Sequence, residues 1–170
     1  MNHFFRLLWT QLASLWRKPV PVLGPCLTPY ICLLTDLDVL RHMNNGTYFS
    51  LLDLARVDLM NRAGVGSKLA QQGWYPVVVA ETMRFRKSLK LFDRFHVETV
   101  VLGWDEKAFL LQQRFLKGHV CVAEAVVRAR FLKKSGGSVT PKEILQLANW
   151  TSESPQLPEW IQNWNQNQIN

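Results

Sequence analysis

Reactive side-chain types are concentrated between residues 35 and 48, in the stretch "TDLDVLRHMNNGTY". Asp36 and Asp38 precede an arginine, His42 and two asparagines, and the chain then becomes apolar. A carboxylate can serve as a general base or as a nucleophile. The N–H groups that open a helix can polarise a carbonyl oxygen. The stretch therefore predicts a hydrolytic site that uses Asp36 or Asp38, and an unreactive surface loop is the alternative.

The helix that such a site requires is predicted to begin near Thr47. Apolar residues recur at helical spacing and so share one face of this helix: Tyr48, Leu52, Ala55, Leu59 and Ala63. Gly64 is a typical residue at which a helix ends. The unpaired N–H groups of its first turn would then lie near Asn45 and Gly46.

Strands are predicted on both sides of this helix. One precedes it at residues 26–34, and four follow at 77–89, 94–104, 108–116 and 120–134. Pro29 favours an edge position for the first strand. A short helix should follow Thr140, which forms a capping box with Glu143. One apolar helix and one antiparallel five-stranded sheet predict an α+β fold in which the sheet wraps the helix.

Two further carboxylates are candidates for a second acid. Glu81 interrupts the apolar alternation Val77, Val79, Met83 and Phe85, so it should point toward the helix. An unpaired carboxylate is costly there, and an ion pair with an arginine or access to solvent is the alternative to catalysis. Asp53, on the helix itself, is the second candidate.

Composition restricts the class of protein. The chain has 170 residues, 48% of them hydrophobic, which suits one globular domain. The formal net charge of +7 favours an anionic partner. Nucleic acid is not expected, because no element combines that charge with exposed aromatics. The cysteines, Cys26, Cys32 and Cys121, predict free thiols in a reducing, cytoplasmic compartment.

Metal chemistry is not expected either. Asp36, Asp38 and His42 could supply ligands, but no distal cluster completes the set.

The two ends differ from this central region. Residues 1–24 predict an amphipathic helix followed by the linker "KPVPVLGP". The helix contains no uninterrupted apolar stretch long enough to span a bilayer. It would lie on a lipid surface, on the protein's own body or on a sister subunit. Residues 149–170 predict a polar C-terminal tail.

The motif formed by Asp38, His42, Met43, "NN" at 44–45 and Tyr48 resembles that of the hotdog-fold acyl-CoA thioesterases of the 4-hydroxybenzoyl-CoA thioesterase type. "VVVAETMRFRKSLKLFDRFHVET" and "SVTPKEI" extend the resemblance over residues 28–147. Within that superfamily, "LGWDEKAFLLQQRF" and "PQLP" resemble most the branch of thioesterase superfamily member six.

The resemblance implies a hotdog domain at residues 25–148 that hydrolyses acyl-CoA to a free acid and coenzyme A. Coenzyme A would be part of the substrate, and no separate cofactor is implied. The catalytic carboxylate would be Asp38, assisted by His42, Asn45 and Gly46, whereas Asp36 would brace the loop. Substrate-binding candidates are Arg41, Asn44, Tyr48, Arg84 and Arg86, with Arg41 standing where many relatives have glycine.

The resemblance also implies a homodimer or a dimer of dimers. Peripheral membrane contact through the N-terminal helix is a further expectation. The alternative function is a non-catalytic acyl-CoA or acyl-carrier binding protein that acts in lipid handling at a membrane surface.

Overall fold

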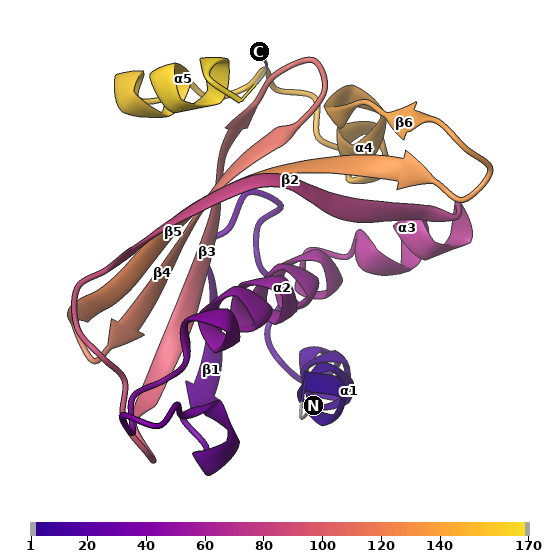
Figure 1. The fold of residues 1–170 in the computed structure, drawn as a ribbon. Coiled ribbons are helices and arrows are strands. Elements are labelled where there is room, and N and C mark those ends of the chain that lie inside the picture. Colours follow the sequence, from indigo (N-terminus) through magenta and orange to yellow (C-terminus); the bar gives the residue numbers. More distant parts are fainter. Residues whose placement is uncertain (1–2, 169–170) are drawn as a thin grey trace.

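A curled antiparallel sheet surrounds one long helix in the computed structural model, which describes residues 3–168 (Figure 1). Residues 1–2 and 169–170 of the predicted terminal segments lie outside the described residues. The helices are α1 (His3–Ser14), α2 (Asn45–Arg62), α3 (Gly66–Gln71), α4 (Pro141–Leu147) and α5 (Glu159–Gln166), with a 3-10 turn, η1, at Leu34–Asp36. The strands are β1 (Cys26–Ile31), β2 (Trp74–Phe85), β3 (Arg94–Trp104), β4 (Phe109–Lys117), β5 (Val120–Lys133) and β6 (Ser138–Val139).

The sheet has the spatial order β1-β3-β4-β5-β2, and the two-residue strand β6 also pairs with β5. Every pairing is antiparallel. Pro29 lies in β1, which is an edge strand as predicted, and β2 forms the other edge. The α+β hotdog arrangement is therefore confirmed, with β6 as an unpredicted addition.

Helix α2 lies across the concave face of the sheet (Figure 1). Leu51, Leu52 and Ala55 are fully buried against strand residues such as Phe115 and Val127. Burial of these apolar side chains is the main force that holds helix and sheet together. The N-terminus of α2 is thereby fixed at one end of the sheet.

Strand β2 departs from the alternation that the sequence predicts. Its pairing with β5 slips between Val78 and Ala80, where a β-bulge adds one residue. Side chains directly opposite each other point to the same face, and Val78 and Glu81 oppose the inward residues Ala129 and Val127. The prediction for Glu81 is confirmed, but it is wrong for Val77, because the bulge reverses the alternation.

The C-terminal segment packs more firmly than its polar composition indicates. Helix α5 lies on the convex face of the sheet, on the side away from α2 (Figure 1). Ile161 is fully buried against Leu110 and Val126. Asn165 accepts a hydrogen bond from Nε of Arg128 at 2.7 Å, so this helix is held by polar contacts as well.

The predicted helix after Thr140 is also present. The Thr140 side chain accepts from the N–H of Glu143, and the Glu143 side chain accepts from the N–H of Thr140, so the capping box is confirmed. Helix α1 forms within the N-terminal segment and packs against α2 (Figure 1). Between residues 3 and 168, no helix combines the length and the apolar content that crossing a membrane requires.

Candidate active site

The loop between η1 and α2 holds Asp38 in a tight turn. The Asp38 N–H donates to the carbonyl of His42 at 2.8 Å, and the Arg41 N–H donates to the carbonyl of Asp38 at 3.0 Å. Oδ1 of Asp38 accepts from the N–H groups of Leu40 at 2.8 Å and of His42 at 3.2 Å. Its Oδ2 has no hydrogen-bond partner among the described residues. One oxygen of this half-buried carboxylate is therefore fixed by its own loop, and the other is available to a water molecule or a substrate.

Asp36 is committed to the structure instead. It is buried, and its two oxygens accept from Nη1 and Nη2 of Arg6 at 2.9 and 2.7 Å. Oδ2 also accepts from the N–H of Leu33 at 2.7 Å. A carboxylate held by three donors braces η1 and leaves little capacity for a reacting group.

Asn44 and Asn45 begin helix α2. Asn44 is the N-cap, and its Oδ1 accepts from the N–H of Gly46 at 2.8 Å. The Gly46 N–H, one of the two predicted oxyanion donors, is therefore already bonded. The Asn45 N–H has no partner among the described residues. It lies at the positive end of the helix dipole, so it is the donor that can still polarise a carbonyl.

A hollow of about 200 Å³ lies where the start of α2 meets the end of β2. Its walls are Met43, Asn45, Tyr48, Phe85, Arg86, Lys87 and Ser88. The predicted residues Asn45, Tyr48 and Arg86 therefore share one concavity. Lys87 belongs to the basic run that begins at Arg84, and such a run favours phosphate binding. Ser88 was not predicted, because it belongs to no motif.

Tyr48 forms the floor of this hollow. It packs edge-on against Phe85 and Phe115, with ring centroids 5.1 and 4.8 Å away. Its hydroxyl oxygen accepts from the N–H of Leu89 at 3.3 Å, and burial raises the pKa of the phenol. Tyr48 is therefore a neutral, rigid wall, and the polar groups around the hollow come from its neighbours.

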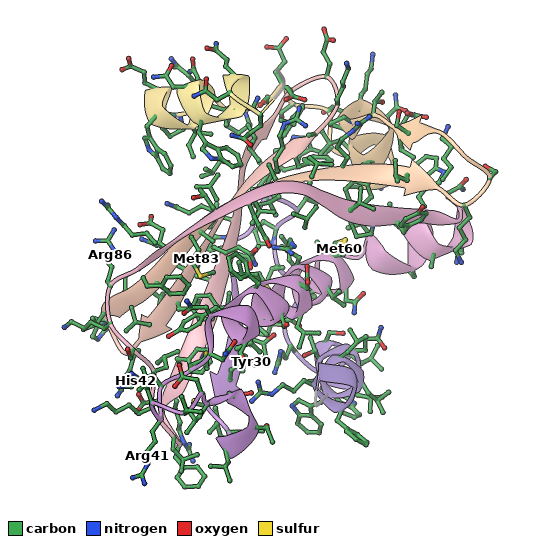
Figure 2. All side chains as sticks on the ribbon, viewed as in Figure 1. Tyr30, Arg41, His42, Met60, Met83 and Arg86 are labelled. Carbon is green, nitrogen blue, oxygen red and sulfur yellow. The ribbon has the colours of Figure 1, made fainter. Side chains whose placement is uncertain are left out.

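The three predicted arginines occupy different environments. Arg86 donates to Glu124 at 2.8 Å while lining the hollow. Arg84 pairs in register with Glu124 on the convex face, away from α2. Arg41 is exposed and adopts a positive φ of 60°, a conformation that glycine adopts more readily. His42 and Arg86 lie along the same side of the molecule, with Arg41 toward its lower tip (Figure 2).

The two candidate second acids, Asp53 and Glu81, lie close enough for their charges to interact, near the middle of α2. Asp53 forms an ion pair with Arg56, which also donates to Oε1 of Gln113 at 2.5 Å. Burial raises the pKa of Glu81, the positive charge of Arg56 opposes that shift, and Asp53 reinforces it. Asp53 is nine residues beyond Asn44, about 13 Å along the helix axis, so these acids do not lie at the hollow in one protomer. Asp38 belongs to the loop that precedes α2 and is not among the residues that line the hollow.

A separate apolar cavity of about 80 Å³ lies at the far end of α2, around Met60 and Ala63. Figure 2 labels Met60. Met60 is 15 residues beyond Asn45, about 22 Å along the helix. This cavity is therefore distinct from the hollow. Among residues 3–168, no group of three or more His, Cys, Asp or Glu side chains is arranged to hold a metal ion.

Known proteins share sequence and fold with this chain. A family model described as the thioesterase-like superfamily matches residues 32–165, which includes the loop of Asp38, helix α2 and the strands β2 to β6. The match continues into α5, beyond the predicted domain end at residue 148.

Two curated relatives are proteins named THEM6. The one from Xenopus laevis is 34% identical over 134 residues, which cover 79% of this chain and 64% of that protein. The one from Danio rerio is 33% identical over 164 residues, which cover 95% of this chain and 80% of that protein. The aligned region thus spans just under two thirds of the frog relative's length.

Among solved structures, a 4-hydroxybenzoyl CoA thioesterase mutant complexed with 4-hydroxybenzoyl CoA superposes with a TM-score of 0.66. The sequence identity is 15%, and the match covers 72% of this chain and 97% of that one. At this identity the likeness establishes the fold.

Proposed function

The chain belongs to the thioesterase-like superfamily, and from that premise we propose that it hydrolyses an acyl-CoA thioester, with Asp38 as the catalytic carboxylate. The proposal depends on how the two oxygens of the Asp38 carboxylate are hydrogen-bonded. Oδ1 is held by two loop N–H groups, and Oδ2 is left without a protein partner among the described residues. A carboxylate oriented on one side and open on the other suits a general base or a nucleophile.

In the proposed reaction, Asp38 either removes a proton from a water molecule as that water adds to the thioester carbonyl, or attacks the carbonyl itself and forms a mixed anhydride that water then hydrolyses. In both routes the C–S bond breaks, and coenzyme A leaves as the thiolate and takes up the proton that the water has lost. The Asn45 N–H supports the oxyanion from the helix terminus. His42 borders the same turn and could orient the water.

The charges around the hollow support coenzyme A as the leaving group. Arg86 and Lys87 line it, and Arg41 is exposed on the catalytic loop. Guanidinium and ammonium groups bind phosphates through charge-assisted hydrogen bonds. Asn44 serves the site indirectly, by capping the helix that carries Asn45.

We propose further that a second copy of the chain completes the site. Strand β2 pairs with β5 on one side, and no strand of residues 3–168 pairs with its other side. Tyr75, Val78, Val79 and Phe85 are partly exposed along it, which is unusual for a long edge strand. Because the hollow lies at the end of β2, a partner on this edge would stand beside it.

The mass of the protein in solution tests the proposed dimer. Val79→Lys should reduce a dimer to a monomer, because an edge lysine opposes strand pairing. Val120→Lys, at a similarly exposed valine where β5 begins, next to the β4–β5 turn, is the matched control and should leave the mass unchanged. Light scattering after size exclusion reads the mass, and a wild-type monomer at all concentrations would exclude the dimer.

One observation favours a second candidate function, acyl-CoA binding without turnover. The Gly46 N–H already donates to Asn44, so only one of the two expected oxyanion donors is available. A site with a weakened oxyanion hole would still hold its ligand.

Release of free thiol from a panel of short, long and aromatic acyl-CoAs separates the two functions. Asp38→Asn should lower kcat about a thousandfold, the usual contribution of a positioned base, while acyl-CoA binding persists. Asp53→Asn and Glu81→Gln are matched controls that should retain activity. Binding without turnover by the wild type would establish the second function, and equal turnover by Asp38→Asn would exclude Asp38 from the chemistry.

A further inference from the structure

Helix α1 is attached to the protein through its polar side. Near its start, Arg6 donates to both oxygens of buried Asp36 and also to the carbonyl of Ile31 at 2.9 Å. Just beyond its end, Arg17 donates to Asp58 at 3.2 Å, and the Asp58 side chain is completely buried. Between these two points Thr10 is 2% exposed. The two ion pairs fix which side of α1 faces the protein.

The opposite side of α1 is apolar and faces outward. Large apolar side chains repeat there at helical spacing and fall within an arc of about 120°. They are Phe5, Leu8, Trp9, Leu12, Leu15 and Trp16, the last two in the turn that ends the helix, with exposures from 41% to 77%. Such a continuous apolar face is unfavourable in water and typical of an interaction surface. We call these six residues the α1 face.

A basic groove of about 780 Å³ runs beside the α1 face, between α1 and the strands β1 and β3. Arg6, Arg17, Arg94 and His96 line it together with aromatic and aliphatic residues. None of its lining residues, all within the described chain, is acidic. Arg6 and Arg17 are engaged with buried carboxylates, so Arg94 and His96 are the groups available to an external anion.

We propose that the α1 face and this groove together dock the protein on an anionic lipid bilayer. The helix would lie in the plane of the interface, with its apolar side chains among the upper acyl chains and lipid phosphates in the groove. Three features favour lipid over a second copy. Tryptophans at positions 9 and 16 suit the membrane interface, the groove and the net charge of +7 complement anionic headgroups, and the candidate dimer edge β2 is at the other side of the sheet.

Cosedimentation of the full chain with vesicles tests the proposal. The wild type should bind phosphatidylcholine vesicles that contain phosphatidylserine, and bind pure phosphatidylcholine vesicles more weakly. Trp16→Glu should weaken binding about tenfold or more, because an aromatic anchor is replaced by a charge. Trp160→Glu, on helix α5 at the opposite end of the molecule, is the matched control and should bind as the wild type does (Figure 1).

The groove is tested separately from the apolar face. The double variant Arg94→Gln, His96→Gln should lose most of the preference for phosphatidylserine while retaining the weak binding to pure phosphatidylcholine. Raising the salt concentration should have the same effect on the wild type. Circular dichroism checks that each variant is folded.

Three results would overturn the proposal. The wild type could fail to bind either vesicle, or Trp160→Glu could weaken binding as much as Trp16→Glu does. Trp16→Glu could also change only the mass of the free protein, which would assign the α1 face to a second copy. None of these measurements depends on turnover, so they leave the proposed hydrolysis untouched.

Discussion

Helices α1 and α2 pack against each other, yet most of their large apolar side chains lie in opposite environments. Helix α2 turns Leu51, Leu52 and Ala55 into the core. Helix α1 turns polar groups inward, and Leu12 and Trp16 face outward with 41% and 77% of their surface exposed. Apolar patterning alone therefore does not determine which face of a helix is buried.

The buried carboxylates account for the difference. Asp36 and Asp58 are 2% and 0% exposed, so each needs a positively charged partner. Arg62 supplies part of the charge to Asp58 from α2, and Arg6 of α1 and Arg17 just beyond it supply the rest. Rotating α1 to bury its apolar face would remove both arginines, which would leave Asp36 without its counter-charge and Asp58 with Arg62 alone.

Breaking an ion pair that holds α1 should cause the largest loss of stability. Asp36→Asn should lower the free energy of unfolding by about 3–5 kcal/mol, because it leaves the Arg6 guanidinium without its counter-charge. Urea denaturation measures the change. Glu124→Gln, in a partly exposed pair with Arg86, is the control and should cost under about 1 kcal/mol. Equal losses would mean that Asp36 does not anchor α1.

A leucine-to-alanine substitution on each helix tests the difference in burial between α2 and α1. Leu52→Ala in α2 should cost about 2–5 kcal/mol, because it leaves a cavity at a fully buried position. Leu12→Ala in α1 should change the stability of the lipid-free protein by less than about 0.5 kcal/mol. Both values come from urea midpoints. A large loss at Leu12 would show that the α1 face is covered in solution.

Two thiols report on the two attachment points of α1. Burial, reinforced by the negative charges of Asp58 and Asp36 respectively, raises the pKa of Cys26 and of Cys32 to about 11. At pH 8 their thiolate fraction should be about a hundredfold lower than for an ordinary thiol, and alkylation correspondingly slow. Because the folded pKa is raised, this contribution to stability is present below about pH 9 and is lost as the pH rises toward 11.

Mass spectrometry after timed alkylation follows each cysteine. Arg17→Ala should accelerate labelling of Cys26, and Asp36→Asn that of Cys32. The half-buried Cys121, on β5, should keep its rate in both variants and serves as the internal control. Simultaneous acceleration at all three sites would indicate global unfolding and not release of α1.

The smallest effect is expected at the helix cap. Asn44→Ala should destabilise the protein by about 1 kcal/mol, because it removes the acceptor for the Gly46 N–H. Asn45→Ala, one residue later and without a side-chain bond among the described residues, should cost less. Thermal denaturation resolves the two. If the released Gly46 N–H joins the oxyanion site, Asn44→Ala will also raise kcat.

Sequence patterns predict the features that depend on neighbouring residues. Helix α2, the edge position of Pro29 and the capping box of Thr140 each follow from local spacing. The motif around Asp38 likewise predicts a helix entry near Asn45 and Gly46, and α2 begins at Asn45.

Features that depend on distant residues were not predictable. The orientation of α1 depends on Asp36 and Asp58, which lie 30 and 41 positions from the arginines they bind. The hollow likewise joins the start of α2 to Ser88, about 40 positions further along the chain. Such contacts leave no periodic trace in the sequence.

The bulge in β2 has a consequence for variation in this strand. It acts as a phase shift: before Val79 the even positions face α2, and after it the odd positions do. Deleting Val79 would remove only the extra residue: Val78 would still oppose Ala129 and Ala80 would still oppose Arg128, so both halves of the strand would keep their inward side chains. A deletion elsewhere in β2 would instead exchange the inward and outward side chains between that position and the bulge. Position 79 is therefore a natural boundary for recombining β2 with other sequences.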